Sequence, residues 1–275
     1  MQKKTQKCGG AQKRSYLCDE KHILSQQNDM GTYINLGNAG FRSARKSEYI
    51  DKSGLIAIIN DTLGSERRFS CVTRARRFGK SMAAKMLCAY YDHSCNSRAL
   101  FADLEIAQHP TFEEHLNKYP VIYLDMTNFV GSPKRDDIVD VIQAAVKADV
   151  VEVFPEVSVG DDLDLMASLI KIHDATGQTF FFIIDEWDAI CREYPAGSPA
   201  MDNYVNWLRR MFKSVNGSIV FAGVYMTGIL PIKKYRTESA LNNVWEYPAR
   251  WRSMPTACCW RASATTARRS STAAA

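Results

Sequence analysis

A Gly-Lys-Ser triplet and an Asp-Glu pair are the residues of this sequence whose types and spacing could carry out chemistry. Gly79-Lys80-Ser81 follows the apolar segment 69–73, and much later in the chain the apolar run 180–184 ends in Asp185-Glu186. Backbone N–H groups at a strand-to-helix turn bind phosphate, helped by the positive end of the helix dipole. Carboxylates at the end of a buried strand can hold a metal ion and activate water. The two segments together therefore predict a nucleotide site.

The Gly-Lys-Ser triplet predicts a phosphate-binding loop in which each residue has its own task. Lys80 would reach the outer phosphates as a point charge, and the Ser81 hydroxyl would ligate Mg²⁺. Gly79 would let the backbone approach the phosphate where a side chain could not. Arg76 and Arg77 would add positive charge or remain solvated, and neither is expected to be catalytic. The expected nucleotide-binding residues are Arg76, Arg77, Phe78, Gly79, Lys80, Ser81 and Met82.

Arg74 stands where the usual phosphate-loop pattern has its first glycine. Because isolated Gly-Lys-Ser triplets are common, a basic surface turn is the competing interpretation. The apolar run before the loop and the helical pattern after it favour phosphate binding.

Three residues beyond the loop are expected to serve catalysis or metal binding. Asp185 would hold Mg²⁺, and Glu186 would orient and deprotonate the attacking water. Their position after an apolar run places them at the carboxyl edge of a sheet, where open α/β sheets bind ligands, although two solvated carboxylates would look the same. Thr227 follows the next predicted strand and could sense the γ-phosphate, or it could simply belong to a Thr-Gly turn. The expected catalytic residues are Glu186, Lys80 and Thr227.

ATP is the expected nucleotide, with Mg²⁺ as its metal ion. No guanine-reading Asn/Thr-Lys-x-Asp motif occurs, because Asn117-Lys118 is followed by Tyr119-Pro120. Adenine is therefore the default base. No Ser-His-Asp or Cys-His arrangement supported by periodicity suggests another reaction.

Strands alternate with helices along the middle of the chain. Apolar runs predict strands at 69–73, 121–126, 180–184 and 219–224, and helical periodicity predicts helices at 55–63, 81–90, 137–150, 163–174 and 203–215. Asp51 is expected to cap the first of these helices. The alternation predicts an α/β fold with three layers, in which a mostly parallel sheet lies between two layers of helices.

Composition places the 275 residues among soluble globular proteins, with 46% hydrophobic and 24% charged residues. The net charge of +5 comes largely from the two ends, which argues against a nucleic-acid groove in the middle of the chain. The eight cysteines form no CxxC pair, which favours reduced thiols. No signal peptide or long apolar run appears, so the protein is expected to be cytoplasmic and not in a membrane.

The sequence divides into three segments. Residues 1–30 are polar and expected to be disordered, residues 31–243 form the P-loop domain, and residues 244–275 form an irregular basic tail. The tail reads either as a disordered segment or as an out-of-frame translation that begins near residue 244, and the second interpretation is favoured.

Several ordered motifs resemble the predicted AAA-ATPase-like family of bacteria, over residues 41–243. They are Tyr49-Ile50-Asp51-Lys52-Ser53, the loop 74–81, Tyr119-Pro120-Val121-Ile122, Asp185-Glu186-Trp187-Asp188 and Thr227-Gly228-Ile229. The arginine at position 74 is the family's own usage. The resemblance implies a P-loop ATPase in which another strand separates the acidic strand from the phosphate-loop strand.

The resemblance also implies what should follow residue 243. Family members continue into a further strand, a helical lid and often a nuclease-like domain of the PD-D/E-XK type. The departure from the family pattern predicts that this chain lacks the lid subdomain and the strand beside the phosphate-loop strand, which leaves an exposed sheet edge. Assembly with further copies and contact with nucleic acid are partners that rest on the family analogy alone.

The leading hypothesis is an ATP-binding P-loop module, a Mg²⁺-dependent ATPase that acts as a conformational switch. Two alternatives stay open. One is a truncated, non-catalytic remnant of such an ATPase, and the other is a nucleic-acid-associated protein that binds through its basic ends.

Overall fold

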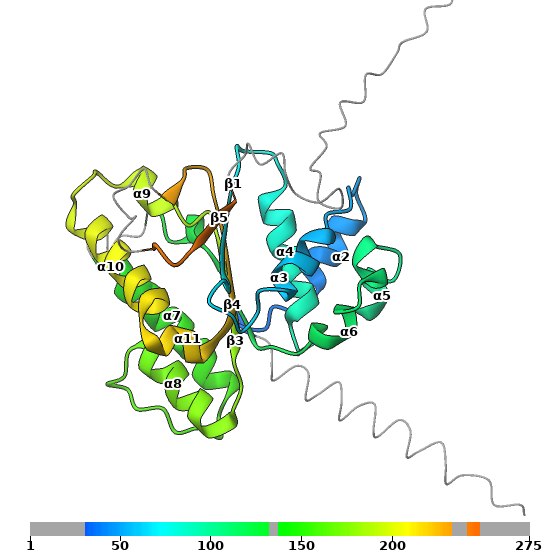
Figure 1. The fold of residues 1–275 in the computed structure, drawn as a ribbon. Helices are drawn as coiled ribbons and strands as arrows, with labels where there is room; N and C mark the ends of the chain where they lie inside the picture. The colour runs from blue at the N-terminus through cyan, green and yellow to red at the C-terminus, as the bar shows by residue number, and fades with distance from the viewer. Residues whose placement is uncertain (1–30, 132–136, 233–240, 248–275) are drawn as a thin grey trace, which may run out of the picture.

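A parallel sheet of five strands forms the centre of the protein in a computed structural model, which describes residues 31–131, 137–232 and 241–247 (Figure 1). The strand order is β2-β3-β4-β1-β5, and all neighbouring strands run parallel. The strands are β1 (Phe69–Thr73), β2 (Val121–Asp125), β3 (Phe180–Asp185), β4 (Phe221–Gly228) and β5 (Trp245–Tyr247). β4 lies between β1 and β3, so the implied separation of the phosphate-loop strand from the acidic strand is confirmed.

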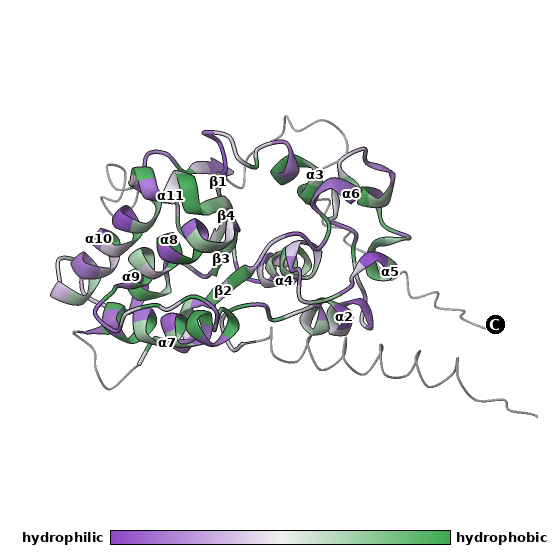
Figure 2. Ribbon diagram, turned by 90° about the horizontal axis from the view of Figure 1, so that it is seen from below, coloured by the Kyte–Doolittle hydropathy of each residue, from purple (hydrophilic) through white to green (hydrophobic). Residues whose placement is uncertain are grey.

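Helices cover both faces of the sheet, which confirms the three-layer α/β/α architecture (Figures 1 and 2). On one face lie α2 (Ala39–Arg45), α3 (Gly54–Asn60), α4 (Lys80–Tyr91), α5 (Arg98–Phe101), η1 (Glu105–Gln108) and α6 (Phe112–His115). On the other lie α7 (Ile138–Val153), α8 (Leu165–Thr176), α10 (Pro199–Lys213) and α11 (Val215–Val220), with α9 (Ala189–Glu193) and η2 (Met126–Asn128) near the carboxyl edge of the sheet.

β3 shows why these residues form a central strand. All six of its residues are buried, as expected for a strand covered on both faces. Phe180 and Phe182 join the core beneath α7 and α10, whereas Phe181 joins the core beneath α4. Because successive side chains point to opposite faces, one apolar run supplies both cores. The Phe181 ring stacks on Tyr91 of α4, with 4.0 Å between the ring centroids.

Most predicted elements are confirmed, and their ends differ for local reasons. The apolar run 219–224 predicts a strand from residue 219, but residues 219 and 220 instead end α11. The Ser214 hydroxyl caps the first turn of this helix by accepting a hydrogen bond from Gly217 N. α10 begins at Pro199 because Ser198 caps it and proline suits the first helical turn. Asp51 does not cap α3; its carboxylate accepts hydrogen bonds from Ser53 N and Glu105 N instead.

The strand expected to be missing beside the phosphate-loop strand is present. β5 pairs with β1, in the register Ser70↔Trp245 to Val72↔Tyr247. The Arg67 guanidinium lies over the Trp245 ring, 4.6 Å from its centroid. The prediction of an uncovered edge beside β1 is therefore wrong. A segment of three residues is too short to show a hydrophobic period in the sequence. β5 is extended because its backbone pairs with β1.

Some predictions fall on residues that the structure does not describe. These predictions concern the polar segment 1–30, the rest of the basic tail (248–275) and the missing lid. Cys71, Cys88, Cys95 and Cys191 form no disulfide among the residues that the structure describes. No helix in the described ranges is long and apolar enough to span a bilayer.

Truncating Phe181 is expected to destabilise the fold strongly, because the ring is fully buried between β3 and α4. Phe181→Ala should lower the free energy of unfolding by about 3–5 kcal/mol in urea denaturation. Val215→Ala is the control, because Val215 is 78% exposed, and it should change stability by less than about 0.5 kcal/mol. A loss below about 1 kcal/mol in Phe181→Ala would contradict this packing.

Candidate functional site

The carboxyl ends of the parallel strands bring most of the candidate site residues together. The loop 74–79 leaves β1, Asp125 ends β2, Asp185 ends β3, and Gly228 ends β4. Parallel strands end at one edge of the sheet, which is where open α/β folds bind ligands. The loop is also tied to β4, because Arg74 N donates to Gly228 O at 3.1 Å.

The loop 74–79 contains two residues with left-handed backbone conformations. Arg77 has a φ of 68° and Gly79 a φ of 76°, and Gly79 is the N-cap of α4. Turns of this kind at the start of a helix, here one of twelve residues, can present backbone N–H groups to an anion. Arg76, Arg77 and Phe78 are exposed at the tip of the loop, whereas Lys80 is buried.

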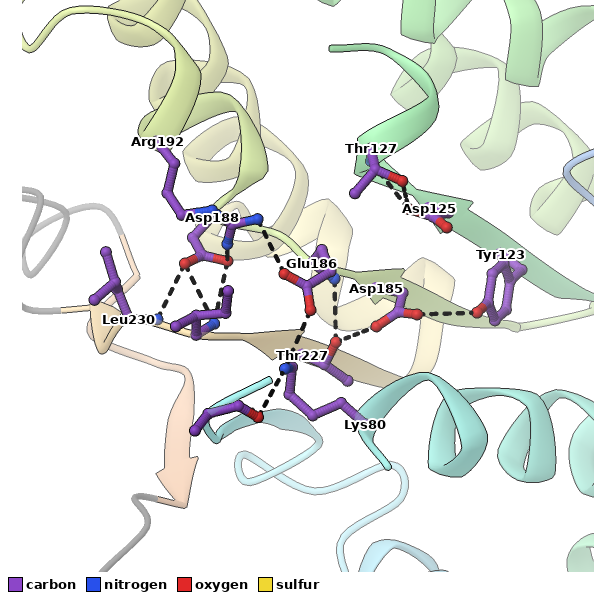
Figure 3. Close-up of polar contacts among 12 residues, drawn as sticks. Lys80, Tyr123, Asp125, Thr127, Asp185, Glu186, Asp188, Arg192, Thr227 and Leu230 are labelled. Atoms are coloured by element: carbon purple, nitrogen blue, oxygen red, sulfur yellow. Dashed lines mark hydrogen bonds and ion pairs between the residues drawn. The ribbon is translucent and has the colours of Figure 1, made fainter. Parts of the chain in front are cut away.

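Lys80 joins the two predicted halves of the site. Its side chain is 4% exposed, and Nζ lies 3.1 Å from Glu186 Oε1 (Figure 3). Nζ also donates to Ala75 O at 3.3 Å. A buried lysine needs an anionic or carbonyl partner, and here the Glu186 carboxylate, directly after β3, supplies the negative charge. The lysine of the loop and the glutamate of the acidic strand therefore meet in space.

Glu186 is held by a second cation that the sequence did not indicate. Arg192 of α9 donates from one amino group to Glu186 Oε2 at 3.0 Å and from the other to Asp188 Oδ1 at 2.5 Å. Asp188 is fully buried and also accepts from Ile229 N and Leu230 N. Glu186 itself has a φ of 54°, which is uncommon outside glycine and marks a residue fixed by its surroundings.

Asp185 lies deeper than Glu186, at 1% exposure. One carboxylate oxygen accepts the Thr227 hydroxyl, and the other lies 3.4 Å from the Tyr123 hydroxyl. Burial raises the pKa of Asp185, and hydrogen bonds from Ser81 and Thr227 oppose that rise. The Thr227 oxygen in turn accepts Glu186 N at 3.1 Å, so Thr227 links both carboxylate residues.

A pocket of about 430 Å³ opens at this edge, within the size range of small-molecule sites. Its lining residues are Arg76, Arg77, Gly79, Lys80, Ser81, Met82, Asp125, Thr127, Glu186 and Arg192. Most of the predicted site residues therefore surround one pocket. Phe78, Asp185 and Thr227 are outside its lining: the first is exposed at the loop tip, and the other two lie buried behind it.

A family model described as "Predicted AAA-ATPase" matches residues 36–237. The chain belongs to the predicted AAA-ATPase-like family. The match spans β1 to β4 and every residue of the candidate site, which confirms the resemblance. No curated protein matches the chain in sequence. The family suggests nucleotide binding, and a nuclease-like domain beyond residue 243 stays a prediction.

Asp125, Thr127 and Arg192 are the pocket residues of this AAA-ATPase-like chain that sequence reasoning missed. Asp125 follows an apolar run just as Asp185 does, so its position carried a signal. Thr127 donates to Asp125 Oδ1 at 2.6 Å, a local turn that no motif announces. Arg192 stands four residues after Asp188, the spacing of a helical ion pair, but α9 is too short to show a helical period.

Removing the Asp185 charge is expected to stabilise the protein when no nucleotide is added. The pKa of Asp185 is higher in the folded than in the unfolded chain, so folding disfavours the carboxylate. That cost is fully present above the folded-state pKa and is absent below the unfolded one. Asp185→Asn should therefore raise the urea midpoint at pH 7, and the gain should shrink as the pH falls towards about 4.

Asp161→Asn serves as the control, because Asp161 is exposed. It should show no such gain at either pH. If Asp185→Asn were no more stable than the wild type at pH 7, the burial of this carboxylate would not be the cost described.

Proposed function

We propose that the pocket binds ATP together with Mg²⁺ and hydrolyses it to ADP and phosphate, and that this drives a conformational switch. The observation that carries the proposal is the 3.1 Å contact between Lys80 Nζ and Glu186 Oε1, two residues that line the pocket. It joins the phosphate loop after β1 to the acidic end of β3, with β4 between them. This arrangement combines a cation for phosphate with a carboxylate for water.

Lys80 and the start of α4 would bind the phosphates. Backbone N–H groups at the first turn of α4 have no partner within the helix and favour an anion. The exposed guanidinium groups of Arg76 and Arg77 add positive charge at the mouth of the pocket. A phosphate would compete with Glu186 for Lys80, so binding would release one oxygen of the Glu186 carboxylate.

Ser81 and Asp185 fit a magnesium ion, because a hydroxyl and a carboxylate are the hard oxygen donors that Mg²⁺ prefers. The Ser81 side chain lowers the pKa of the Asp185 carboxyl, which is consistent with the two groups facing one site. When bound, the ion would neutralise phosphate charge. Asp125 is a further carboxylate on the pocket wall.

Glu186 would orient the attacking water and accept its proton once Lys80 has turned to the phosphates. Arg192 would keep the other carboxylate oxygen in place, because Asp188 anchors the guanidinium from behind. Thr227 would act on the γ-phosphate indirectly, since its hydroxyl positions both Asp185 and the Glu186 backbone. Catalysis would thus rest on positioning and charge, as in other phosphoryl transfers.

Lys80→Ala is expected to weaken MgATP binding by about a hundredfold, or about 2.8 kcal/mol, in isothermal titration calorimetry. The reason is the loss of the buried cation nearest the proposed phosphate position. Lys85→Ala is the control, because Lys85 lies exposed on the same helix. If Lys80→Ala bound MgATP as tightly as the control, the phosphate-loop assignment would fail.

Glu186→Gln is expected to separate binding from turnover. Glutamine keeps the shape of the side chain but cannot accept a proton from water, so phosphate release should fall about 10²–10⁴-fold. MgATP affinity should not fall, because the substitution leaves the loop intact and removes the charge that competes with phosphate for Lys80. Unchanged turnover in this variant would remove Glu186 from the role of base.

A further inference from the structure

The segment Tyr49–Ser53 is one of the motifs on which the resemblance to the family rests, yet the proposed chemistry gives it no task. The structure shows it firmly anchored. The Asp51 carboxylate accepts Ser53 N at 2.7 Å and Glu105 N at 2.8 Å, and the Ser53 hydroxyl accepts Ile106 N at 3.1 Å. Lys52 therefore extends from a segment whose two neighbouring residues are held in place by hydrogen bonds.

Lys52 contacts the phosphate loop at the peptide between Phe78 and Gly79. Its Nζ donates to Phe78 O at 3.2 Å. A Cβ atom placed on Gly79 would lie only 2.3 Å from the same Nζ, so the ammonium sits directly against the glycine. Burial lowers the pKa of Lys52, as expected for an ammonium packed against backbone. Gly79 is thus needed both for its φ of 76° and for this close approach.

The orientation of this peptide decides what the loop offers an anion. In a planar trans peptide, the C=O and the N–H point in opposite directions. The Phe78–Gly79 bond is trans, so a carbonyl held on the Lys52 side leaves the Gly79 N–H directed away from Lys52. Gly79 lines the pocket. A reversed peptide would present a carbonyl oxygen to phosphate, and glycine resists such a reversal less than any other residue.

We propose that Lys52 is a positioning residue of the phosphate loop, which holds the Phe78 carbonyl and thereby directs the Gly79 N–H into the pocket for phosphate oxygens. The inference rests on the proposed function, because it assigns Lys52 to the same nucleotide site. Lys52 acts through the backbone and not by touching phosphate, which distinguishes it from Lys80.

The test uses the full chain with Lys52→Met, Lys52→Arg and the control Lys46→Met. Methionine keeps the length of the side chain without its charge, arginine keeps a donor, and Lys46 is exposed at the end of α2. In calorimetric titrations, Lys52→Met should bind MgATP at least about tenfold more weakly. Lys52→Arg should stay within about threefold of the wild type, and Lys46→Met should match it.

The peptide itself can be observed, because Phe78-Gly79 is the one Phe-Gly pair in the sequence. Protein labelled with ¹³C at phenylalanine carbonyls and ¹⁵N at glycine gives a single carbonyl-to-amide correlation, which reports this bond. Without nucleotide, Lys52→Met should shift that signal, whereas Lys46→Met should not. With the wild type, MgATP should move its amide proton, as expected for a new hydrogen bond to phosphate.

Each outcome bears on a distinct claim. Wild-type affinity in Lys52→Met, or an unmoved Phe78-Gly79 signal in that variant, overturns the inference and leaves the nucleotide site standing. Failure of the wild-type protein to bind MgATP overturns the proposed function and the inference with it. Should Lys52→Met fold poorly, loss of affinity in a well-folded Lys52→Arg would also overturn the inference.

Discussion

The ion pair between Lys80 and Glu186 is the interaction on which the site depends. Lys80 begins α4, the helix that follows β1, and Glu186 directly follows β3, and these two strands are not neighbours in the sheet. Only the parallel order, with β4 between them, brings both ends to one edge. Because Lys80 is almost fully buried, its charge needs a partner, and Glu186 provides one that a phosphate could replace. In the proposed mechanism, binding and catalysis therefore share one contact.

The residues around this pair form a chain of alternating charge. Glu186 lies between Lys80 and Arg192, and Arg192 lies between Glu186 and the fully buried Asp188. Burying these charges costs desolvation energy. The neighbouring Asp185 incurs the same kind of cost, because burial raises the pKa of its carboxyl. Protein sites commonly accept such costs where groups must be positioned in advance. The left-handed backbone at Glu186 belongs to the same pattern.

The sequence predicted the parts of this structure that local patterns determine. Continuous apolar runs gave β1 and β3 because both faces of these strands are covered, and Gly-Lys-Ser gave the start of α4 because that turn requires glycine. β5 was missed because its three residues form a strand only by pairing with β1. Arg192 and Lys52 were missed as site residues for a related reason: their roles depend on contacts with Glu186 and Phe78, which lie outside their own elements.

A crystal structure of the full chain with Mg²⁺ and a non-hydrolysable ATP analogue tests the central claim most directly. The phosphates should lie at the start of α4, and Lys80 Nζ should have left Glu186 for a phosphate oxygen. Arg192 should still hold the other oxygen of Glu186. A nucleotide bound elsewhere, with the Lys80–Glu186 pair unchanged, would contradict the proposed site.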